Sequence, residues 1–365
     1  MSNTIELARE YSALDKLLHR IAFIHPSLQR ILGELENDLF KRSLKSVQIR
    51  QPVFIVGLPR AGTTLLLELL FDTNEFASFT YRQMPFVLNP LLWNKLTARS
   101  QQPAHMEQRA HGDNMKISYD SPEAFEEVLW KNHLTNKLFS DGSILPLDKT
   151  AIDNDFRTTF RSLVKKLIYL ANLNTPTAST SMPRYLSKNN ANLSRLDAIT
   201  SVFDDATLLC CFRHPASHVA SLHYQHNRFT DLHETDRFSQ QYMSWIGHHD
   251  FGHNFLPTRF GQPNPHDPAD RIFWLQYWID AYQYVLDHAP PDTQFVCYES
   301  LLEDGPTTLA QISEYAHIDS SEKLIASADR LRAPTSLSLC LDSISTTLAD
   351  KAESLYLALS ERVQK

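Results

Sequence analysis

Several features that would mark other classes of protein are missing from this 365-residue chain. There is no run of about eighteen apolar residues, and the N-terminus lacks the apolar segment of a signal peptide, so we expect a soluble, cytoplasmic protein without a membrane span. A formal net charge of −7 argues against general binding to nucleic acid. The chain also has no repeats, no low-complexity tract and no long linker.

Cysteine is scarce, and its four copies follow neither a disulfide nor a metal-binding pattern. Three of them, Cys210, Cys211 and Cys297, fall in predicted buried strands, which is typical of core thiols in a reducing compartment. Histidine has sixteen copies, and His214 and His218 have the i, i+4 spacing of zinc ligands. Because His-Glu-x-x-His and an acidic magnesium motif are both absent, we predict no metal site. The histidines are expected on helix surfaces or in an acceptor pocket.

The order of the predicted elements indicates an α/β fold, with a P-loop-like parallel sheet of about five strands flanked by helices. With 42% hydrophobic residues, the chain can bury the core of one large domain. Residues 1–48 are expected to form N-terminal helices, 50–335 a nucleotide-binding core with a helical insertion, and 343–365 a C-terminal helix. Within the core, helices are predicted over 121–133 and 157–172.

The most informative segment is 52–70, where an apolar run is followed at once by a glycine-bounded loop and a leucine-rich stretch. This is the strand–loop–helix pattern of a P-loop, in which backbone N–H groups and a helix N-terminus face an anion. The spacing of Gly57 and Gly62 matches the Walker A frame, but Thr63 stands where an ATP or GTP enzyme carries lysine. The loop has its positive charge at Arg60 instead. It is therefore equipped for an anion, but poorly equipped for a nucleoside triphosphate.

Two further cations follow predicted strands. Arg213 comes directly after the apolar residues 206–212, and Pro215 suits the first position of the next helix, about two turns before Ser221. Lys188 ends a second short strand. Ligands of open α/β sheets bind outside the carboxyl ends of the strands, so cations there are candidates for binding an anion. The alternative for Arg213 and Ser221 is a surface ion pair and a solvated helical position.

Together these segments resemble sulfotransferases that use 3′-phosphoadenosine 5′-phosphosulfate (PAPS). The loop is similar to the 5′-phosphosulfate loop of that family, and Arg213 with Ser221 is similar to its 3′-phosphate site. Residues 188–190 resemble its Lys-Asn-Pro or Lys-Asp-Pro element, although Asn190 replaces the proline. Residues 295–301 resemble a late strand and turn of the family that is mainly architectural. The resemblance covers roughly residues 50–335.

The resemblance implies transfer of a sulfuryl group from PAPS to a hydroxyl or amine, with no metal required. The acceptor can be a small molecule, a carbohydrate, a lipid or a peptide. Arg60 and Lys188 would be catalytic cations near the scissile bridge, while Arg213 and Ser221 would bind the 3′-phosphate. The donor-binding loop implied by the match consists of Pro59, Arg60, Ala61, Gly62, Thr63, Thr64 and Leu65. Near the end of the core, Arg330 and Arg332 lie where the family often has a basic loop over the 3′-phosphate.

The general base is less well defined by the sequence. Some family branches place Glu about twenty residues after the loop arginine, where this chain has Tyr81. His111, with Asp113 as an orienting carboxylate, is the first candidate for a base, and Glu127 is the second. Residues 120–127 also fit the capped start of a helix, in which acidic side chains stabilise the helix dipole.

Two other functions are compatible with parts of the pattern. A P-loop kinase would need lysine at position 63 and an acidic magnesium ligand, and neither is evident. A non-catalytic nucleotide-binding protein would use the same loop, so the sequence leaves that alternative open. The aromatic residues of the segment 245–284 fit either a helical core or the wall of an acceptor pocket.

Overall fold

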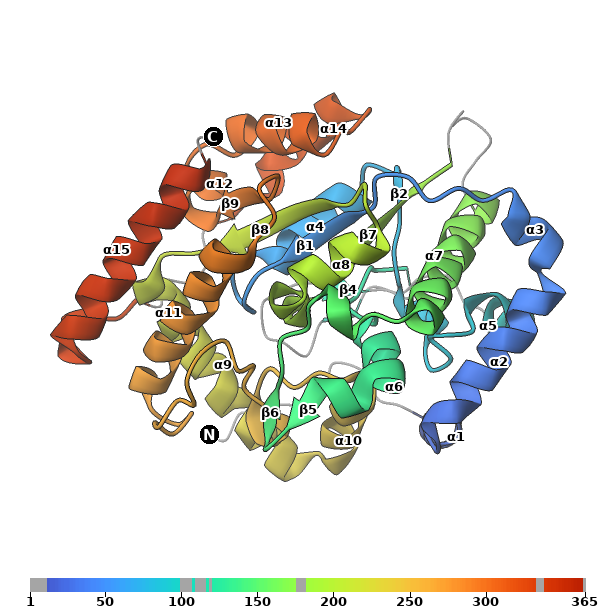
Figure 1. Cartoon of the computed structure of the whole chain (residues 1–365), viewed down its shortest axis with the longest axis horizontal. Helices are drawn as coiled ribbons and strands as arrows, with labels where there is room; N and C mark the ends of the chain where they lie inside the picture. The colour runs from blue at the N-terminus through green and yellow to red at the C-terminus, as the bar shows by residue number, and fades with distance from the viewer. Residues whose placement is uncertain are drawn as a thin grey trace.

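A five-stranded parallel sheet with helices on both faces forms the centre of the protein (Figure 1). The computed structural model describes residues 12–98, 107–108, 116–117, 120–174, 182–332 and 338–363. The α/β fold expected from the sequence is confirmed. In order across the sheet, the strands are β2 (Phe76–Ala77), β7 (Arg184–Lys188), β1 (Val53–Val56), β8 (Thr207–Phe212) and β9 (Gln294–Cys297).

The central strand β1 explains why both faces of the sheet are covered. All four of its residues are apolar and fully buried, as is usual for a parallel strand between two helical layers. Successive side chains point to opposite faces. Val53 and Ile55 belong to one hydrophobic cluster, whereas Phe54 and Val56 belong to another. The sheet therefore separates two cores.

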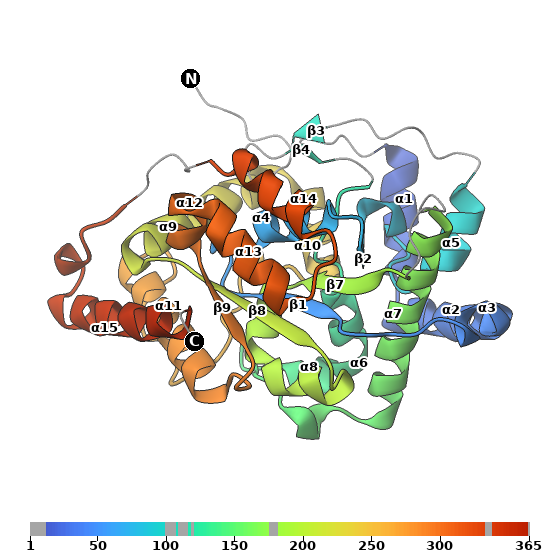
Figure 2. The same ribbon diagram turned by 90° about the horizontal axis from the view of Figure 1, so that it is seen from above.

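The smaller core lies between the sheet and a layer of helices that combines the helix after β1 with three helices from residues 298–326 (Figure 2). The leucine-rich stretch that follows β1 packs here through Leu66, Leu67, Leu69 and Leu70. The helices of this layer are α4 (Thr63–Phe71), α12 (Tyr298–Glu303), α13 (Gly305–Tyr315) and α14 (Ser321–Ala326).

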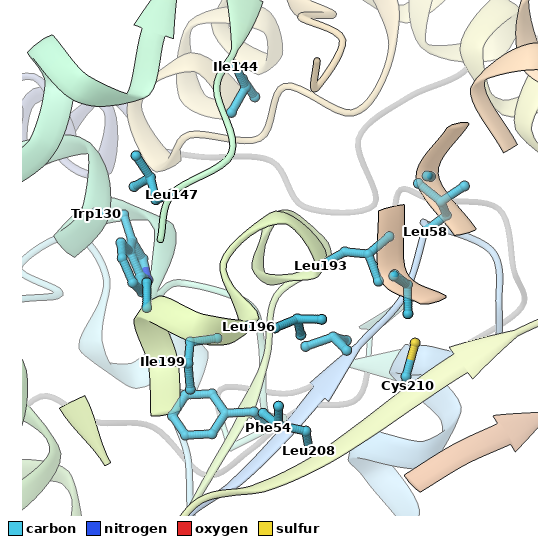
Figure 3. Packing of buried hydrophobic residues seen from close by; sticks show 14 of the residues in the cluster. Phe54, Leu58, Trp130, Ile144, Leu147, Leu193, Leu196, Ile199, Leu208 and Cys210 are labelled. Atoms are coloured by element: carbon cyan, nitrogen blue, oxygen red, sulfur yellow. The ribbon is translucent and has the colours of Figure 1, made fainter. Parts of the chain in front are cut away.

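The larger core fills the opposite face of the sheet. Phe54 and Leu208 of the sheet lie against Ile199, and Trp130 packs in the same cluster (Figure 3). The helices that contribute to it include α6 (Glu127–Leu138), α7 (Asn154–Asn174), α8 (Leu196–Val202), α9 (Pro215–Thr235), α11 (Arg271–His288) and α15 (Thr346–Val363).

The remaining elements surround this framework. The two hairpins are β3 (Glu107–Gln108) with β4 (Lys116–Ile117), and β5 (Phe139–Ser140) with β6 (Ser143–Ile144). The other α-helices are α1 (Ala13–Ala22), α2 (Pro26–Leu39), α3 (Lys41–Lys45), α5 (Pro90–Thr97) and α10 (Arg237–Ile246). The 3₁₀ turns are η1 (Tyr81–Gln83), η2 (Lys149–Ala151), η3 (Asn190–Ser194), η4 (Gly252–Asn254), η5 (Ser327–Arg330) and η6 (Leu341–Ser343).

Most of the expected elements are present, and one is displaced. The helix predicted over 157–172 is α7, and the three cysteines expected in strands are buried in β8 and β9. The helix predicted over 121–133 is wrong at its start, because α6 begins only at Glu127. The acidic residues before it have tertiary partners instead of capping it: Asp120 pairs with Arg82, and Glu123 accepts a hydrogen bond from the Tyr81 hydroxyl at 2.7 Å.

The topology brings several loops to one edge of the sheet. From β1 the chain continues to β2 and β7 on one side of that strand, and β8 and β9 lie on its other side. Because all five strands are parallel, the segments after β1, β7 and β8 leave from the same edge, where ligands of such sheets bind. In the described part of the chain, no helix combines the length and the apolar character needed to cross a bilayer.

Candidate active site

The loop between β1 and α4 has a backbone that only glycine accommodates easily at its two ends. Gly57 and Gly62 have φ values of +147° and +88°. A Cβ atom at Gly57 would lie 2.5 Å from the carbonyl oxygen of Cys211, and one at Gly62 would lie 2.7 Å from the ring of Tyr298. The loop is thus held closely between β8 and α12. It leads into α4 at Thr63, so the unsatisfied N–H groups of the first helical turn face the end of the loop.

Arg60 of this loop lies beside the two residues predicted to bind a second phosphate. Its Nε donates a hydrogen bond to the Ser221 hydroxyl at 3.2 Å. The guanidinium of Arg213 lies 3.4 Å from the Arg60 carbonyl oxygen and donates to Ser217 at 2.9 Å. Arg213 is buried, and this burial lowers its pKa. The fold therefore brings Arg60 of the loop after β1 together with Arg213 and Ser221 of the segment after β8.

A buried histidine, His218, supports the loop through a hydrogen bond to its backbone. His218 accepts a hydrogen bond at Nδ1 from the indole N–H of Trp278 at 3.1 Å, so its own hydrogen is on Nε2. That Nε2 donates to the carbonyl oxygen of Pro59 at 2.7 Å. Burial is the main reason that the pKa of His218 falls to about 3. The expectation of a helix-surface or pocket histidine is wrong here, because His218 is a neutral part of the core that positions the loop.

Tyr298 links the loop with the strand-end arginine. One part of its ring lies against Gly62, and the guanidinium carbon of Arg213 lies 4.8 Å from the ring centre, within cation–π distance. The sequence indicated only an architectural role for this segment. The structure places the tyrosine ring in contact with both predicted anion-binding segments, a relationship that no local pattern in the sequence signals.

On the other side of the loop, a polar chain starts at Thr63. Its hydroxyl donates to Oδ1 of Asn190 at 3.3 Å, and Nδ2 of Asn190 donates to Oδ2 of Asp250 at 3.3 Å. Nε2 of His248 lies 3.6 Å from the same Asp250 oxygen. Lys188, at the end of β7, is buried next to Ile55 of β1 in the sheet register. Asp250 and His248 were not singled out from the sequence as site residues.

The two candidates for a general base have different outcomes. His111 lies outside the described residues. Glu127 forms a buried, bidentate ion pair with Arg195, with N–O distances of 2.6 and 2.8 Å, and also accepts from Asn189 at 2.8 Å. Both carboxylate oxygens of Glu127 are therefore engaged in structural contacts.

The predicted basic residues near the end of the core are also placed by the structure. Arg330 pairs with Asp72 at the end of α4, and Arg332 donates to the backbone carbonyls of Asp329 and Leu331. These are contacts of exposed side chains near α14. Among the described residues, no group of three or more histidine, cysteine or acidic side chains is arranged to hold a metal ion.

The fold is that of an α/β protein with a P-loop-like parallel sheet, and its loop after β1 carries arginine and lacks the lysine of nucleoside-triphosphate enzymes. The model of the sulfotransferase family matches residues 52–262, more than half of the chain. This protein therefore belongs to the sulfotransferase family, and it is a transferase that moves a sulfuryl group. The matched segment contains the loop, Lys188, Arg213 and Ser221.

Solved structures of sulfotransferases match most of the length of this chain. STF9 from Mycobacterium avium is 14% identical, with 94% of this chain and 86% of that chain covered and a TM-score of 0.51. STF1 from Mycobacterium tuberculosis H37Rv is also 14% identical over the same shares of the two chains, with a TM-score of 0.46. At this identity, the likeness to STF9 concerns the fold alone. A search of curated proteins found no match.

Proposed function

We propose that the sulfuryl donor of this enzyme is PAPS, and that the loop and the end of β8 bind its two ends. The observation that carries the proposal is the contact of Arg60 with Ser221 and of Arg213 with the Arg60 backbone. A donor with both a 5′-phosphosulfate and a 3′-phosphate needs two cationic anion sites next to each other. An ordinary nucleoside triphosphate has no 3′-phosphate, so it would leave the second of these cationic sites empty.

The two ends of the donor are assigned to different residues. The 5′-phosphosulfate is assigned to the loop, where the backbone N–H groups of Ala61, Gly62 and Leu65 and the hydroxyls of Thr63 and Thr64 can donate hydrogen bonds to it. Pro59 has no N–H and contributes only to the shape of the loop. The 3′-phosphate is placed at Arg213 and Ser221. Its arrival would replace the hydrogen bond that Ser221 now accepts from Arg60 and would release the Arg60 guanidinium toward the phosphosulfate.

The chemistry then consists of positioning and of stabilising charge. As the sulfate–phosphate bridge breaks, negative charge develops on the 5′-phosphate, and Arg60 and Lys188 are the cations that would stabilise it. Lys188 is well placed for this because the strand that carries it is the direct neighbour of β1. By analogy with phosphoryl transfer, such a site needs an in-line acceptor and little covalent assistance from the protein.

The proposal also concerns the acceptor side. Glu127 was predicted as a base, but its contacts with Arg195 and Asn189 favour a positioning role, and we assign it that role. A Cβ atom at Gly247 would lie 2.5 Å from Cγ of Glu127, so the glutamate also supports the loop after α10. The acceptor carries a hydroxyl or an amine, and the panel below covers phenols, sugars, lipids and peptides.

The donor is tested by ligand binding and by transfer. Thermal unfolding is measured with 3′-phosphoadenosine 5′-phosphate (PAP), ATP and GTP, and we expect a clear rise in Tm with PAP only. Labelled PAPS is then incubated with the protein and a panel of phenols, sugars, lipids and peptides to detect labelled products. Stronger stabilisation by ATP than by PAP would refute the proposed donor. Stabilisation by PAP without any turnover of PAPS would favour the non-catalytic alternative.

A further inference from the structure

The loop between α10 and η4 carries a carboxylate, Asp250, that the sequence patterns did not indicate as a candidate site residue, although it lies within the segment 245–284. Asp250 lies in this loop and is about a quarter exposed, at 27% for its side chain. Two hydrogen bonds, through Asn190, connect it to the Thr63 hydroxyl at the start of α4. Asn190 also follows Lys188 by two positions at the carboxyl end of β7. Asp250 is therefore connected, through the single side chain of Asn190, to the end of the loop over which we propose that the phosphosulfate binds.

The contacts of the Asp250 side chain with Asn190 and His248 both involve the same carboxylate oxygen, Oδ2. Asn190 donates to Oδ2 at 3.3 Å, and His248 lies 3.6 Å from the same oxygen. Glu127 packs against Gly247 at the start of the loop between α10 and η4, and Arg195 fixes the Glu127 side chain by an ion pair. A carboxylate that is oriented through one oxygen and partly exposed has the properties needed to accept a proton from a bound hydroxyl.

We propose that Asp250 is the general base of the transfer reaction, oriented by Asn190 and His248; this rests on the function proposed above. In the reaction, the acceptor oxygen forms a bond to sulfur while the bond from sulfur to the oxygen bridging to the 5′-phosphate breaks. The bridging oxygen leaves with the electron pair as part of PAP. The proton of the acceptor hydroxyl passes to Asp250 and from there to water. Glu127 and Arg195 are positioning residues in this arrangement.

The test compares two acceptors that differ in their need for a base. 4-Nitrophenol is largely ionised at pH 8, whereas phenol has a pKa near that of tyrosine, about 10, and must lose a proton during transfer. The variants are Asp250→Asn, Asp250→Glu, and Asp231→Asn as a matched control on the exposed face of α9. The rate of PAPS turnover is measured with each acceptor, and the rise in Tm with PAP is measured in parallel.

We expect Asp250→Asn to reduce kcat/KM with phenol on the order of a hundredfold or more, with a much smaller effect for 4-nitrophenol. The Tm rise with PAP should be unchanged, and Asp250→Glu should retain more of the phenol activity than Asp250→Asn. The ratio of the two rates within one variant does not depend on the fraction of folded protein, so a less stable variant remains informative. Equal losses for both acceptors, or no loss, would overturn the assignment.

If neither phenol reacts with the wild-type protein, release of labelled sulfate from PAPS to water provides the comparison. Asp250→Asn should then slow this release on the order of a hundredfold, and an unchanged rate would overturn the assignment. A wild-type protein that neither gains stability from PAP nor turns over PAPS would instead contradict the proposed donor. The two failures are therefore distinguishable.

Discussion

Nε of Arg60 lies 3.2 Å from the hydroxyl oxygen of Ser221, although 161 positions separate the two residues in the chain. This hydrogen bond joins the loop after β1 to the helix after β8. It brings into contact two of the segments with which the sequence resembles sulfotransferases. The predictions below test what these segments and their support contribute.

Replacing Arg213 should weaken binding of the 3′-phosphate. A hydrogen bond to a charged group contributes about 1.5–3 kcal/mol, so Arg213→Ala should raise the Kd for PAP by about ten- to a hundredfold. Calorimetric titration with PAP measures this effect. Adenosine 5′-phosphosulfate, which lacks the 3′-phosphate, should bind the variant and the wild type almost equally. A similar loss for both ligands would contradict the assignment of Arg213 to the 3′-phosphate.

Replacing Arg60 should slow the transfer step. One preorganised donor at a developing negative charge is worth about 2.7–4 kcal/mol, so Arg60→Ala should reduce kcat with PAPS on the order of a hundredfold or more. Arg42→Ala removes the same type of side chain from an exposed position in α3 and serves as the control. Single-turnover measurements separate this step from binding. If Arg60→Ala keeps its rate and loses only affinity, the arginine binds the donor without assisting the reaction.

The energetic cost of a side chain between Gly62 and Tyr298 can be measured by comparing Gly62→Ala with an alanine substitution at Gly142, which has open surroundings. Gly142 has φ +70°, and no heavy atom lies within 4 Å of a Cβ added there, so Gly142→Ala should cost only the backbone strain of about 1–2 kcal/mol. Gly62→Ala has similar strain and in addition forces a Cβ atom into the Tyr298 ring, which should cost a further 1–3 kcal/mol or so. Urea unfolding of both variants gives the comparison. Equal costs would mean that Tyr298 moves aside freely.

His218 should make the free energy of unfolding depend on pH. Its pKa is about 3 in the folded protein and has an ordinary value of 6.5. Between these values the unfolded chain binds the proton and the folded chain does not, so stability falls as the pH is lowered through this range. The slope from this one residue is about 1.4 kcal/mol per pH unit. Urea unfolding of the wild type and His218→Gln at pH 4.5, 5 and 5.5, where the histidine of the unfolded chain is almost fully protonated, should give slopes that differ by about this amount. Parallel curves would be evidence against a neutral, buried His218.

The buried ion pair of Glu36 and Lys166 should behave as a unit. The two side chains are 2.8 Å apart and almost inaccessible to solvent, and burial lowers the pKa of Lys166 and raises that of Glu36. Lys166→Met leaves the carboxylate alone and should destabilise the protein by about 3–5 kcal/mol. In the double variant Lys166→Met/Glu36→Gln, the glutamine can still accept the hydrogen bond from the Leu92 N–H, so much of the stability should return. An additive double variant would rule out the coupling.

The loop and the strand-end cations could be predicted from the sequence because their evidence is local. Gly57, Gly62 and Arg60 lie within six consecutive positions, and an apolar strand directly before Arg213 is enough to place that residue at the edge of a parallel sheet. The confirmed helix α7 has the same origin, since its apolar residues recur along one face.

Where the prediction was wrong, a distant partner outweighed a local one. Glu123 was expected to cap a helix, but it binds the hydroxyl of Tyr81, 42 positions earlier. Glu127, the second candidate for the base, also has a distant partner: Arg195, 68 positions later, binds both of its oxygens, which is why we propose a positioning role for it. A helix-capping pattern reflects only interactions between residues close together in the chain. The contacts of Glu123 and Glu127 with distant residues form only when the chain has folded.

The amino-acid pattern alone was therefore sufficient for the fold class and the family, because the motifs that indicate them consist of residues close together in the chain. Only the folded chain showed the hydrogen bond from Arg60 to Ser221, the support of the loop by His218 and the connection of Asp250 to Thr63 through Asn190. Their physical cause is that the hydrogen bonds involved connect separate loops, which meet only because parallel strands end at a common edge.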